Sequence, residues 1–304
     1  MNTHVLTASE HQNTQVMAMR RAGNSIMSEF SRVLKREGRK LVSLSQAVRT
    51  KCMAFLGKRG PSRTCQVPGL RRIVATHLAT TATGTFVEVG AYDGERFSNT
   101  SWLADNGWRG VYVEPSSEFS RLCRLRHCLN RVQVINVAAG EADGHAMLKQ
   151  IGSLSTLSDE TFDEYQRIPW ARGQIEKKLE HHGITIRRLD SILESLECSV
   201  GFELLVVDVE GFEESVFRGF DLERWQPRML IVELCDVHED FSANTELVQS
   251  AQRVRAHISN SGYTEVYRDA INTVFVRCQS GYPSNMGDLT NGSDDTSHER
   301  QKAA

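Results

Sequence analysis

The sequence predicts a doubly wound α/β fold with a mostly parallel sheet. Hydrophobic runs of strand length alternate with stretches of helical periodicity over residues 64–278, which is the pattern of such folds. The run at 202–209 (FELLVVDV) is almost continuously apolar, as expected for a central parallel strand covered on both faces. Only five residues separate the runs at 263–267 and 273–277. These two strands are therefore expected to form an antiparallel hairpin at the end of the domain.

The same pattern gives the individual elements in order. Strands are predicted at 85–89, 110–113, 132–137, 202–209, 229–234, 263–267 and 273–277, and helices at 68–80, 95–106, 116–128, 212–217 and 246–259. Ser116 or Ser117 is the expected N-cap of the third helix. The charged segment 158–183 interrupts the alternation. An insertion of this kind predicts a lid or a substrate-binding element.

The two ends of the chain differ from this domain. Residues 1–63 contain 12 Lys and Arg against 3 Glu, a net charge of +9, whereas the rest of the chain carries −11. Apolar residues recur at roughly helical spacing from Ile26 to Phe55, so a basic, partly helical extension is expected. Four roles stay open for it: a membrane-surface helix, a self-association or partner helix, an organelle transit peptide, or a helix docked on its own domain. Residues 279–304 are polar and predict a disordered tail.

Composition excludes several classes of protein. The 304 residues are 40% hydrophobic and 24% charged, which is ordinary for a soluble domain, and no apolar run is long enough to span a membrane. The seven cysteines are scattered and contain no CxxC pair, so neither a disulfide framework nor a zinc site is indicated, and a cytoplasmic location is expected. Because the main domain is acidic, nucleic acid is not an expected partner.

A candidate cofactor site begins where the first predicted strand ends. Glu88, Gly90, Asp93 and Gly94 form an E-x-G-x-x-x-G pattern there, and glycines let the backbone approach a ligand closely. Asp93 stands where a dinucleotide would place its pyrophosphate, and a carboxylate attracts an ammonium or sulfonium group instead. Glu114 ends the second strand, 24 residues beyond Gly90, where it can accept hydrogen bonds from a ribose diol. The pattern favours S-adenosylmethionine over NAD.

Two later segments add candidates. Ala138 and Ala139 follow the third strand and leave room for an adenine ring, although close packing of strand against helix explains them equally well. Asp208 and Glu210 leave the buried strand on the same side. Carboxylates there must be paired, hydrogen-bonded or directed into a site. Asp208 is a candidate general base or metal ligand, and Glu210 is a candidate for contacting the substrate or the methionyl amine, or for capping the next helix.

These blocks resemble the FkbM-type methyltransferases, which depend on S-adenosylmethionine. The resemblance covers about two thirds of the chain, from Thr85 to Arg277, and is specific in its order and spacing. Its carriers are FVEVGAYDGERFSNT (86–100), YVEPS (112–116), NVAAGEADG (136–144), SLSTL (153–157), IRRLDSIL (186–193), LLVVDVEGFEESVFRGF (204–220), LIVEL (230–234) and YRDAINTVFVR (267–277). It implies a Rossmann-like class I methyltransferase fold with a seven-stranded sheet. Many relatives have Asp and Asn where this chain has Glu88 and Tyr92, which puts contacts by Tyr92 in doubt.

The resemblance also implies roles for residues. The methionyl part of the cofactor would contact Glu88, Gly90, Asp93, Gly94 and Ser98; Glu114 would hold the ribose, Ala138 or Ala139 would lie near the adenine, and Asp208, Glu210 and Gly211 would bracket the reacting centre. Relatives mostly methylate hydroxyls of sugars, glycolipids or polyketides, so O-methylation of a small-molecule or glycan acceptor is expected.

The catalytic base has two candidates in the sequence. Asp208 is the first, and His238, just past the strand at 229–234, is the second. A divalent metal held by Asp208 with Glu233 or Asp236 is left open, and no residue is assigned to a metal.

Other functions stay open at this point. One is a catalytically inactive module of the same fold that only binds the cofactor. A nucleotide-sugar or NAD enzyme of this fold would need a diphosphate beside Asp93, which the charge disfavours. A nucleic-acid methyltransferase is less favoured still, because the main domain is acidic and the chain lacks the N/D-P-P-Y/F string.

Overall fold

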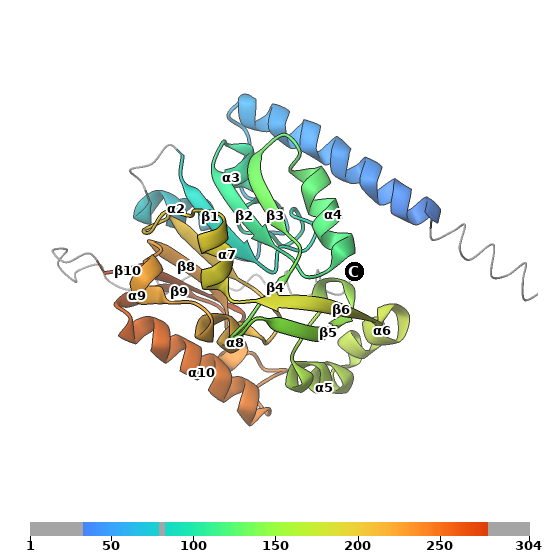
Figure 1. Cartoon of the computed structure of the whole chain (residues 1–304), viewed down its shortest axis with the longest axis vertical. Helices are drawn as coiled ribbons and strands as arrows, with labels where there is room; N and C mark the ends of the chain where they lie inside the picture. The colour runs from blue at the N-terminus through green and yellow to red at the C-terminus, as the bar shows by residue number, and fades with distance from the viewer. Residues whose placement is uncertain (1–32, 79–82, 279–304) are drawn as a thin grey trace, which may run out of the picture.

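The structure is a computed structural model that describes residues 33–78 and 83–278. The first 32 residues of the predicted extension and the predicted disordered tail at 279–304 lie outside the described residues. Within the described ranges the chain forms a large sheet flanked by helices, with a smaller sheet and two helices at one end (Figure 1).

The large sheet has seven strands in the order β3-β2-β1-β7-β8-β10-β9. They are β1 (Thr85–Val89), β2 (Arg109–Val113), β3 (Arg131–Ile135), β7 (Leu204–Val207), β8 (Met229–Glu233), β9 (Tyr263–Arg268) and β10 (Asn272–Arg277). The first five pair in parallel, whereas β10 is antiparallel to both β8 and β9. The predicted doubly wound sheet with a terminal hairpin is confirmed.

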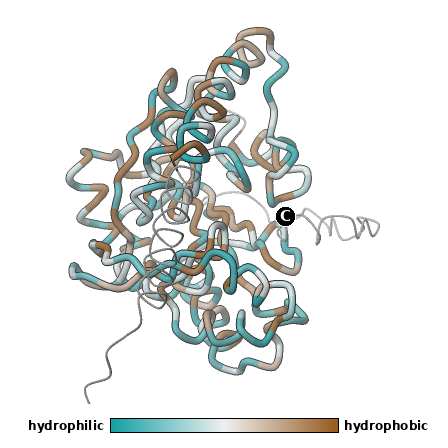
Figure 2. The backbone as a smooth tube through the Cα atoms, turned by 90° about the vertical axis from the view of Figure 1, so that its right-hand side faces the viewer, coloured by the Kyte–Doolittle hydropathy of each residue, from teal (hydrophilic) through white to brown (hydrophobic). Residues whose placement is uncertain are grey.

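Helices cover both faces of this sheet (Figure 1). One face carries α2 (Leu70–His77), α3 (Ser101–Asp105) and α4 (Ser117–Arg126), and the other carries α7 (Leu189–Ser195), α8 (Glu213–Arg218), α9 (Leu222–Trp225) and α10 (Thr245–Asn260). Successive strand residues point to opposite faces. Phe86 therefore packs with Trp102 of α3, and its neighbour Val87 belongs to the core that contains Trp225. Figure 2 shows hydrophobic and hydrophilic residues alternating along the surrounding helices, as expected for helices with one buried face.

A second, three-stranded sheet was not predicted. It has the order β4-β6-β5, formed by β4 (Ala138–Ala139), β5 (Gly144–Gln150) and β6 (Glu180–Arg187). The short turn η1 (Gly152–Leu154) and helices α5 (Asp159–Arg167) and α6 (Pro169–Lys178) lie between β5 and β6. The predicted insertion at 158–183 is therefore mostly a helical pair, which shares a small core with Phe241 from the loop before α10.

The last two residues of the helix predicted at 68–80 lie outside the described residues. Otherwise the remaining predicted elements are present with ends that differ by at most three residues, except for one helix. The helix predicted at 95–106 begins only at Ser101, so its first half is wrong. Phe97 has a φ of 60°, which a helix does not allow. The Ser98 hydroxyl accepts the N–H groups of Thr100 and Ser101 at 3.2 and 3.0 Å. Side-chain hydrogen bonds thus hold residues 95–100 as a turn instead of a helix.

The described part of the N-terminal extension is a helix at residues 33–55, which we call the N-terminal helix. Ser43, Ala47 and Thr50 on one side of it are buried, so this side is docked on the domain. Beyond the helix, Arg59 joins Arg126 in a buried ion pair with Asp105, at 2.8 and 2.7 Å. In the described part of the chain no helix is both long and apolar enough to cross a membrane.

Candidate functional site

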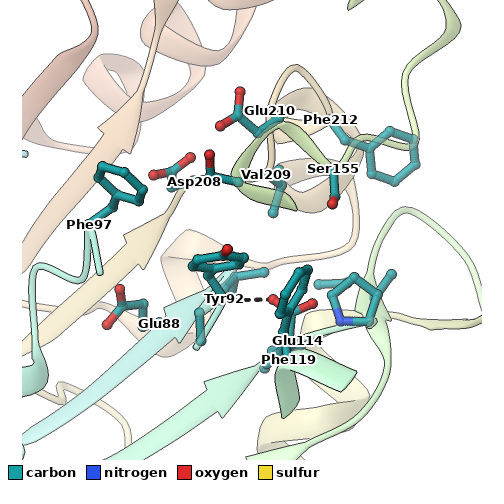
Figure 3. A pocket seen from close by; sticks show the side chains of 18 of the residues that line it. Glu88, Tyr92, Phe97, Glu114, Phe119, Ser155, Asp208, Val209, Glu210 and Phe212 are labelled. Carbon is teal, nitrogen blue, oxygen red and sulfur yellow. Dashed lines mark hydrogen bonds between the residues drawn. The ribbon is translucent and has the colours of Figure 1, made fainter. Parts of the chain in front are cut away.

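A cleft opens at the carboxyl ends of β1, β2 and β7, the edge where ligands bind in open α/β sheets. Its empty space, including the part open to solvent, is about 810 Å³. Glu88 and Glu114 lie on one side of it and Asp208 and Glu210 on the other (Figure 3). The predicted site residues that line the cleft are Glu88, Gly90, Ser98, Glu114, Ala138, Ala139, Asp208 and Glu210.

The turn after β1 depends on Gly90. Its φ is +89°, and a Cβ atom added there would lie 1.7 Å from the backbone oxygen of Asp208. The Gly90 N–H donates to the oxygen of Val113 in β2 at 2.9 Å. Gly90 therefore lets three strand ends approach one another at the floor of the cleft.

Glu88 is a buried carboxylate held by hydroxyl groups. Ser98 donates to its Oε2 atom at 3.0 Å, and Thr100 donates to the same atom. Burial raises the pKa of Glu88 to about 7, although these hydrogen bonds act in the opposite direction. A cationic group that enters the cleft would favour the ionised form of Glu88.

Glu114 is fixed by the backbone on both of its oxygens. Oε2 accepts the N–H of Tyr92 at 2.9 Å, and Oε1 accepts the N–H of Ser116 at 2.8 Å. Burial raises the pKa of Glu114 to about 8. Each oxygen retains acceptor capacity, so the carboxylate is oriented to receive hydroxyl donors from a ligand in the cleft.

Asp93 and Gly94 are not among the residues that line the cleft. The Asp93 carboxylate accepts the N–H groups of Glu95 and Arg96 at 3.0 and 2.9 Å. A Cβ atom at Gly94 would lie 2.7 Å from the sulfur of Cys123 in α4. Both residues shape the turn that carries the lining residues, and their predicted contacts with the cofactor stay predictions.

The loop after β7 carries Asp208 and Glu210. Glu210 has a φ of 53° and accepts a hydrogen bond from the hydroxyl of Tyr165 in α5. The N–H groups of Val209 and Gly211 donate to Glu213 Oε1 at 3.0 and 3.2 Å. These loop amides are therefore bound by Glu213, while Glu210 extends toward the insertion.

A second cleft of about 460 Å³ adjoins the first and shares Glu210 with it. It is formed between the insertion and α10, and its lining includes Thr161, Tyr165, Glu213 and Glu233. The carboxyl groups in this lining can accept hydrogen bonds from a ligand with hydroxyl or amino donors.

Carboxylate oxygens of Asp208, Glu210 and Glu233 lie within 4.8 Å of one another. This is a donor set that a hard divalent cation such as Mg²⁺ or Ca²⁺ accepts. Asp236, the other acid named from the sequence, instead forms an ion pair with Arg255 at 2.7 Å. His238 lines neither cleft, and its Nδ1 accepts the N–H of Asp240 at 3.2 Å.

Some lining residues were not predicted, and Tyr92, whose contacts the sequence puts in doubt, is among the residues that line the cleft. Tyr92 and Phe119 pack with ring centroids 4.3 Å apart and, with Pro115, form an apolar wall beside Glu114. Pro115 follows Glu114 directly, so its place could have been read from the strand end. Nothing in the sequence indicates that Tyr165, in the insertion, would reach Glu210.

The buried carboxyls predict how the stability of the ligand-free protein depends on pH. Burial raises the pKa of Glu88 to about 7 and of Glu114 and Glu213 to about 8, from 4.5. The folded state therefore holds protons that the unfolded state has released, and the stability that they supply is lost as pH rises through the folded pKa values. We expect the free energy of unfolding to fall between about pH 7 and about pH 8.5, by up to about 1.4 kcal/mol per pH unit for each group.

Urea unfolding at several pH values in this range measures the slope. The range begins at pH 7 because burial lowers the pKa of His127 to about 3, and unfolding is favoured by protonation of that histidine at lower pH. Glu114→Ala should make the slope shallower, because one titrating group is gone. A stability that is flat or rises with pH in this range would contradict the raised pKa values.

Comparison with known proteins assigns the chain to a family. Among curated proteins no match is found. The O-methyltransferase from Bacillus cereus, solved in complex with SAH, is 17% identical over 78% of this chain and 91% of that chain, with a TM-score of 0.41. The O-methyltransferase TomG from Streptomyces achromogenes, solved in complex with SAM, is 14% identical over 78% and 90%, with a TM-score of 0.43. The methyltransferase FkbM domain matches residues 88–265, more than half of the chain. That match begins at Glu88 and includes both sides of the cleft, and the chain belongs to the FkbM family of S-adenosylmethionine-dependent methyltransferases.

Proposed function

We propose that the protein transfers the methyl group of S-adenosylmethionine to a hydroxyl oxygen of a sugar, glycolipid or polyketide-like acceptor. The observation that carries this proposal is the set of four carboxyl groups around one cleft, namely Glu88, Glu114, Asp208 and Glu210. Among the described residues that line the cleft, Arg96 is the single cationic side chain. An ammonium and a sulfonium group are attracted to such a cleft, whereas a diphosphate is repelled.

The two sides of the cleft would do different work. Glu88 would face the methionyl ammonium group, and the oriented oxygens of Glu114 would accept the ribose hydroxyls. The wall of Tyr92, Pro115 and Phe119 would pack beside the adenine. When bound, the cofactor supplies the electrophilic methyl group, so the protein has to align the acceptor and exclude water.

Methylation of an alcohol also requires that its proton be removed. With the cofactor bound, the acceptor oxygen would form a bond to the methyl carbon as the carbon–sulfur bond breaks, which would leave a neutral thioether and an acceptor proton for the protein to remove. We assign the proton to Asp208, which lines the cleft, and prefer it to His238, which does not. The acceptor would enter through the second cleft, which meets the first at Glu210.

The first test is calorimetric titration of the protein with S-adenosylmethionine, S-adenosylhomocysteine and, as a control, NAD. Both sulfur compounds should bind and NAD should not. Glu114→Ala should weaken their binding by about 1–3 kcal/mol, the scale of leaving a buried hydrogen-bonding group without its partner. The matched control is Glu118→Ala, because Glu118 is paired with Arg39 and does not line the cleft.

Each outcome of the titration is informative. Binding of NAD, or unchanged affinity in a folded Glu114→Ala variant, would contradict the cofactor site. Binding of both sulfur compounds without methyl transfer to any of a panel of glycans, glycolipids and hydroxylated small molecules would favour the inactive binding module. Strong, salt-dependent binding of RNA or DNA would instead support nucleic acid as the acceptor.

A further inference from the structure

The N-terminal helix is docked with its polar side inward. Ser43, Ala47 and Thr50, at spacings of four and three residues, are the buried positions. At the docked side, Lys51 Nζ donates to the backbone oxygen of Asp105 at 3.1 Å and to Asn130 Oδ1 at 3.0 Å. Small and polar side chains therefore make the contact that apolar side chains usually make in a globular protein.

The opposite side of this helix is apolar and exposed. Leu34, Leu41, Val48 and Phe55 are 57%, 67%, 57% and 92% exposed. They recur every seven residues, about two helical turns, so they lie along one line of the helix. We call these four residues the outer stripe. Leu44, 39% exposed, lies next to it. Exposed apolar side chains gathered along one side of a helix mark a binding face.

Charge indicates what the stripe binds. From residue 33 to residue 58 the chain contains seven Lys and Arg and a single acidic residue, Glu37. An apolar face flanked by cations is the pattern of helices that lie in the interface of an anionic bilayer. The apolar side chains enter the boundary between headgroups and acyl chains, while cations that the domain does not bind, such as the exposed Lys35 and Arg49, meet the lipid phosphates.

A second copy of the chain fits this face less well. Two such helices packed stripe to stripe would bring together two segments of net charge +6, which repel each other. Beyond the helix and Leu56, which directly follows it, the exposed large hydrophobic residues of the described part of the chain lie singly on separate elements: Leu129, Met147, Trp170, Val200 and Val237. They form no complementary apolar surface.

The helix also has a defined direction relative to the cleft. Arg39 pairs with Glu118 at 2.7 Å, in the first turn of α4, just after the carboxyl end of β2. Lys51, twelve residues later, contacts Asp105 and Asn130, next to the opposite ends of β2 and β3. The helix thus begins at the edge of the sheet that carries the cleft, and Figure 1 shows it running along α4.

We propose that the outer stripe of the N-terminal helix binds the surface of a bilayer that contains anionic lipids and holds the cleft edge of the protein beside it. This proposal does not depend on the chemistry of the methyl transfer.

The test is sedimentation of the full chain with lipid vesicles. We expect binding to vesicles of phosphatidylcholine and phosphatidylglycerol, weaker binding at high salt, and little binding to phosphatidylcholine alone. The double variant Leu41→Glu/Val48→Glu should lower the affinity for the anionic vesicles about tenfold or more, because two apolar side chains are lost and two negative charges gained. The matched control is Leu129→Glu/Met147→Glu, with the same charge change at positions 51% and 56% exposed outside the helix.

Light scattering measures the oligomeric state of each variant, and calorimetric titration measures its affinity for S-adenosylmethionine. The cofactor affinity should be unchanged in both double variants, which shows that they are folded. The proposal is overturned if the full chain does not bind anionic vesicles, or if the helix variant and the control bind alike. If the protein does not bind vesicles but forms a dimer, and the Leu41→Glu/Val48→Glu variant is a monomer, the outer stripe binds a second copy of the chain instead.

Discussion

Asp208→Asn should bind S-adenosylmethionine nearly as well as the unmodified protein and transfer its methyl group about 10²–10⁴ times more slowly, the usual contribution of a general base. Asparagine has the same shape as aspartate but cannot take the proton from an alcohol. The side chain leaves β7 at the cleft, where the backbone N–H of Asp208 is anchored to the oxygen of Val89 at 3.0 Å. The substitution therefore removes a proton acceptor without moving the loop.

Single-turnover transfer of a radiolabelled methyl group to an identified acceptor measures this effect, with calorimetry of the cofactor in parallel. His238→Gln is the comparison, because that ring lines neither cleft and its loss should leave the rate unchanged. A fully active Asp208→Asn variant would end the proposed role of Asp208.

The neighbouring carboxylates allow a base to be distinguished from a metal ligand. If Asp208 acts as a base, a chelator leaves the rate unchanged and Glu233→Gln lowers it much less than Asp208→Asn does. If Asp208, Glu210 and Glu233 hold a divalent cation, the chelator abolishes transfer, and Glu233→Gln matches Asp208→Asn. Calorimetric titration with Mg²⁺, Ca²⁺ or Mn²⁺ separates the two cases without an acceptor.

The large sheet could be predicted because its signals are local. The buried strands β1, β2, β7 and β8 are short, mainly apolar runs, and the run at 202–209 contains the central strand β7 that lies between β1 and β8. The predicted N-cap is also local, since Ser116 accepts the N–H of Phe119. Residues at strand ends, such as Glu114 and Asp208, share a cleft because parallel strands end at the same edge.

What could not be predicted depends on contacts between distant segments. Residues 95–100 have a helical pattern, but the hydroxyls of Ser98 and Thr100 bind the buried Glu88 and the chain turns instead. Tyr165 reaches Glu210 only because α5 packs on the loop after β7. The orientation of the N-terminal helix could not be predicted for the same reason. The helical spacing of its apolar residues is visible in the sequence, but Ser43 and Ala47 are buried because of the domain surface that they contact.

Gly90→Ala should cost the protein both stability and cofactor binding. The new Cβ atom would lie 1.7 Å from the Asp208 oxygen and 2.8 Å from its carbonyl carbon, and both are backbone atoms that no rotamer change can move. The strand ends must separate, which costs about 1–3 kcal/mol as overpacking, in addition to about 1 kcal/mol for a non-glycine residue at positive φ. Separation also moves the turn that follows Glu88 and donates to Glu114, so the affinity for S-adenosylmethionine should fall at least about tenfold.

Gly262→Ala is the matched control. Gly262 has a φ of +86°, against +89° for Gly90, but no atom lies within 4 Å of the position that its Cβ would occupy. The Gly262→Ala variant should therefore lose only the stability that the backbone strain costs, and its affinity for S-adenosylmethionine should be unchanged. Urea unfolding and calorimetry of both variants separate the strain common to them from the close approach found only at Gly90. Equal losses of stability and equal cofactor affinities in the two variants would mean that β1 and β7 tolerate separation, and that the cleft does not depend on the contact between Gly90 and Asp208.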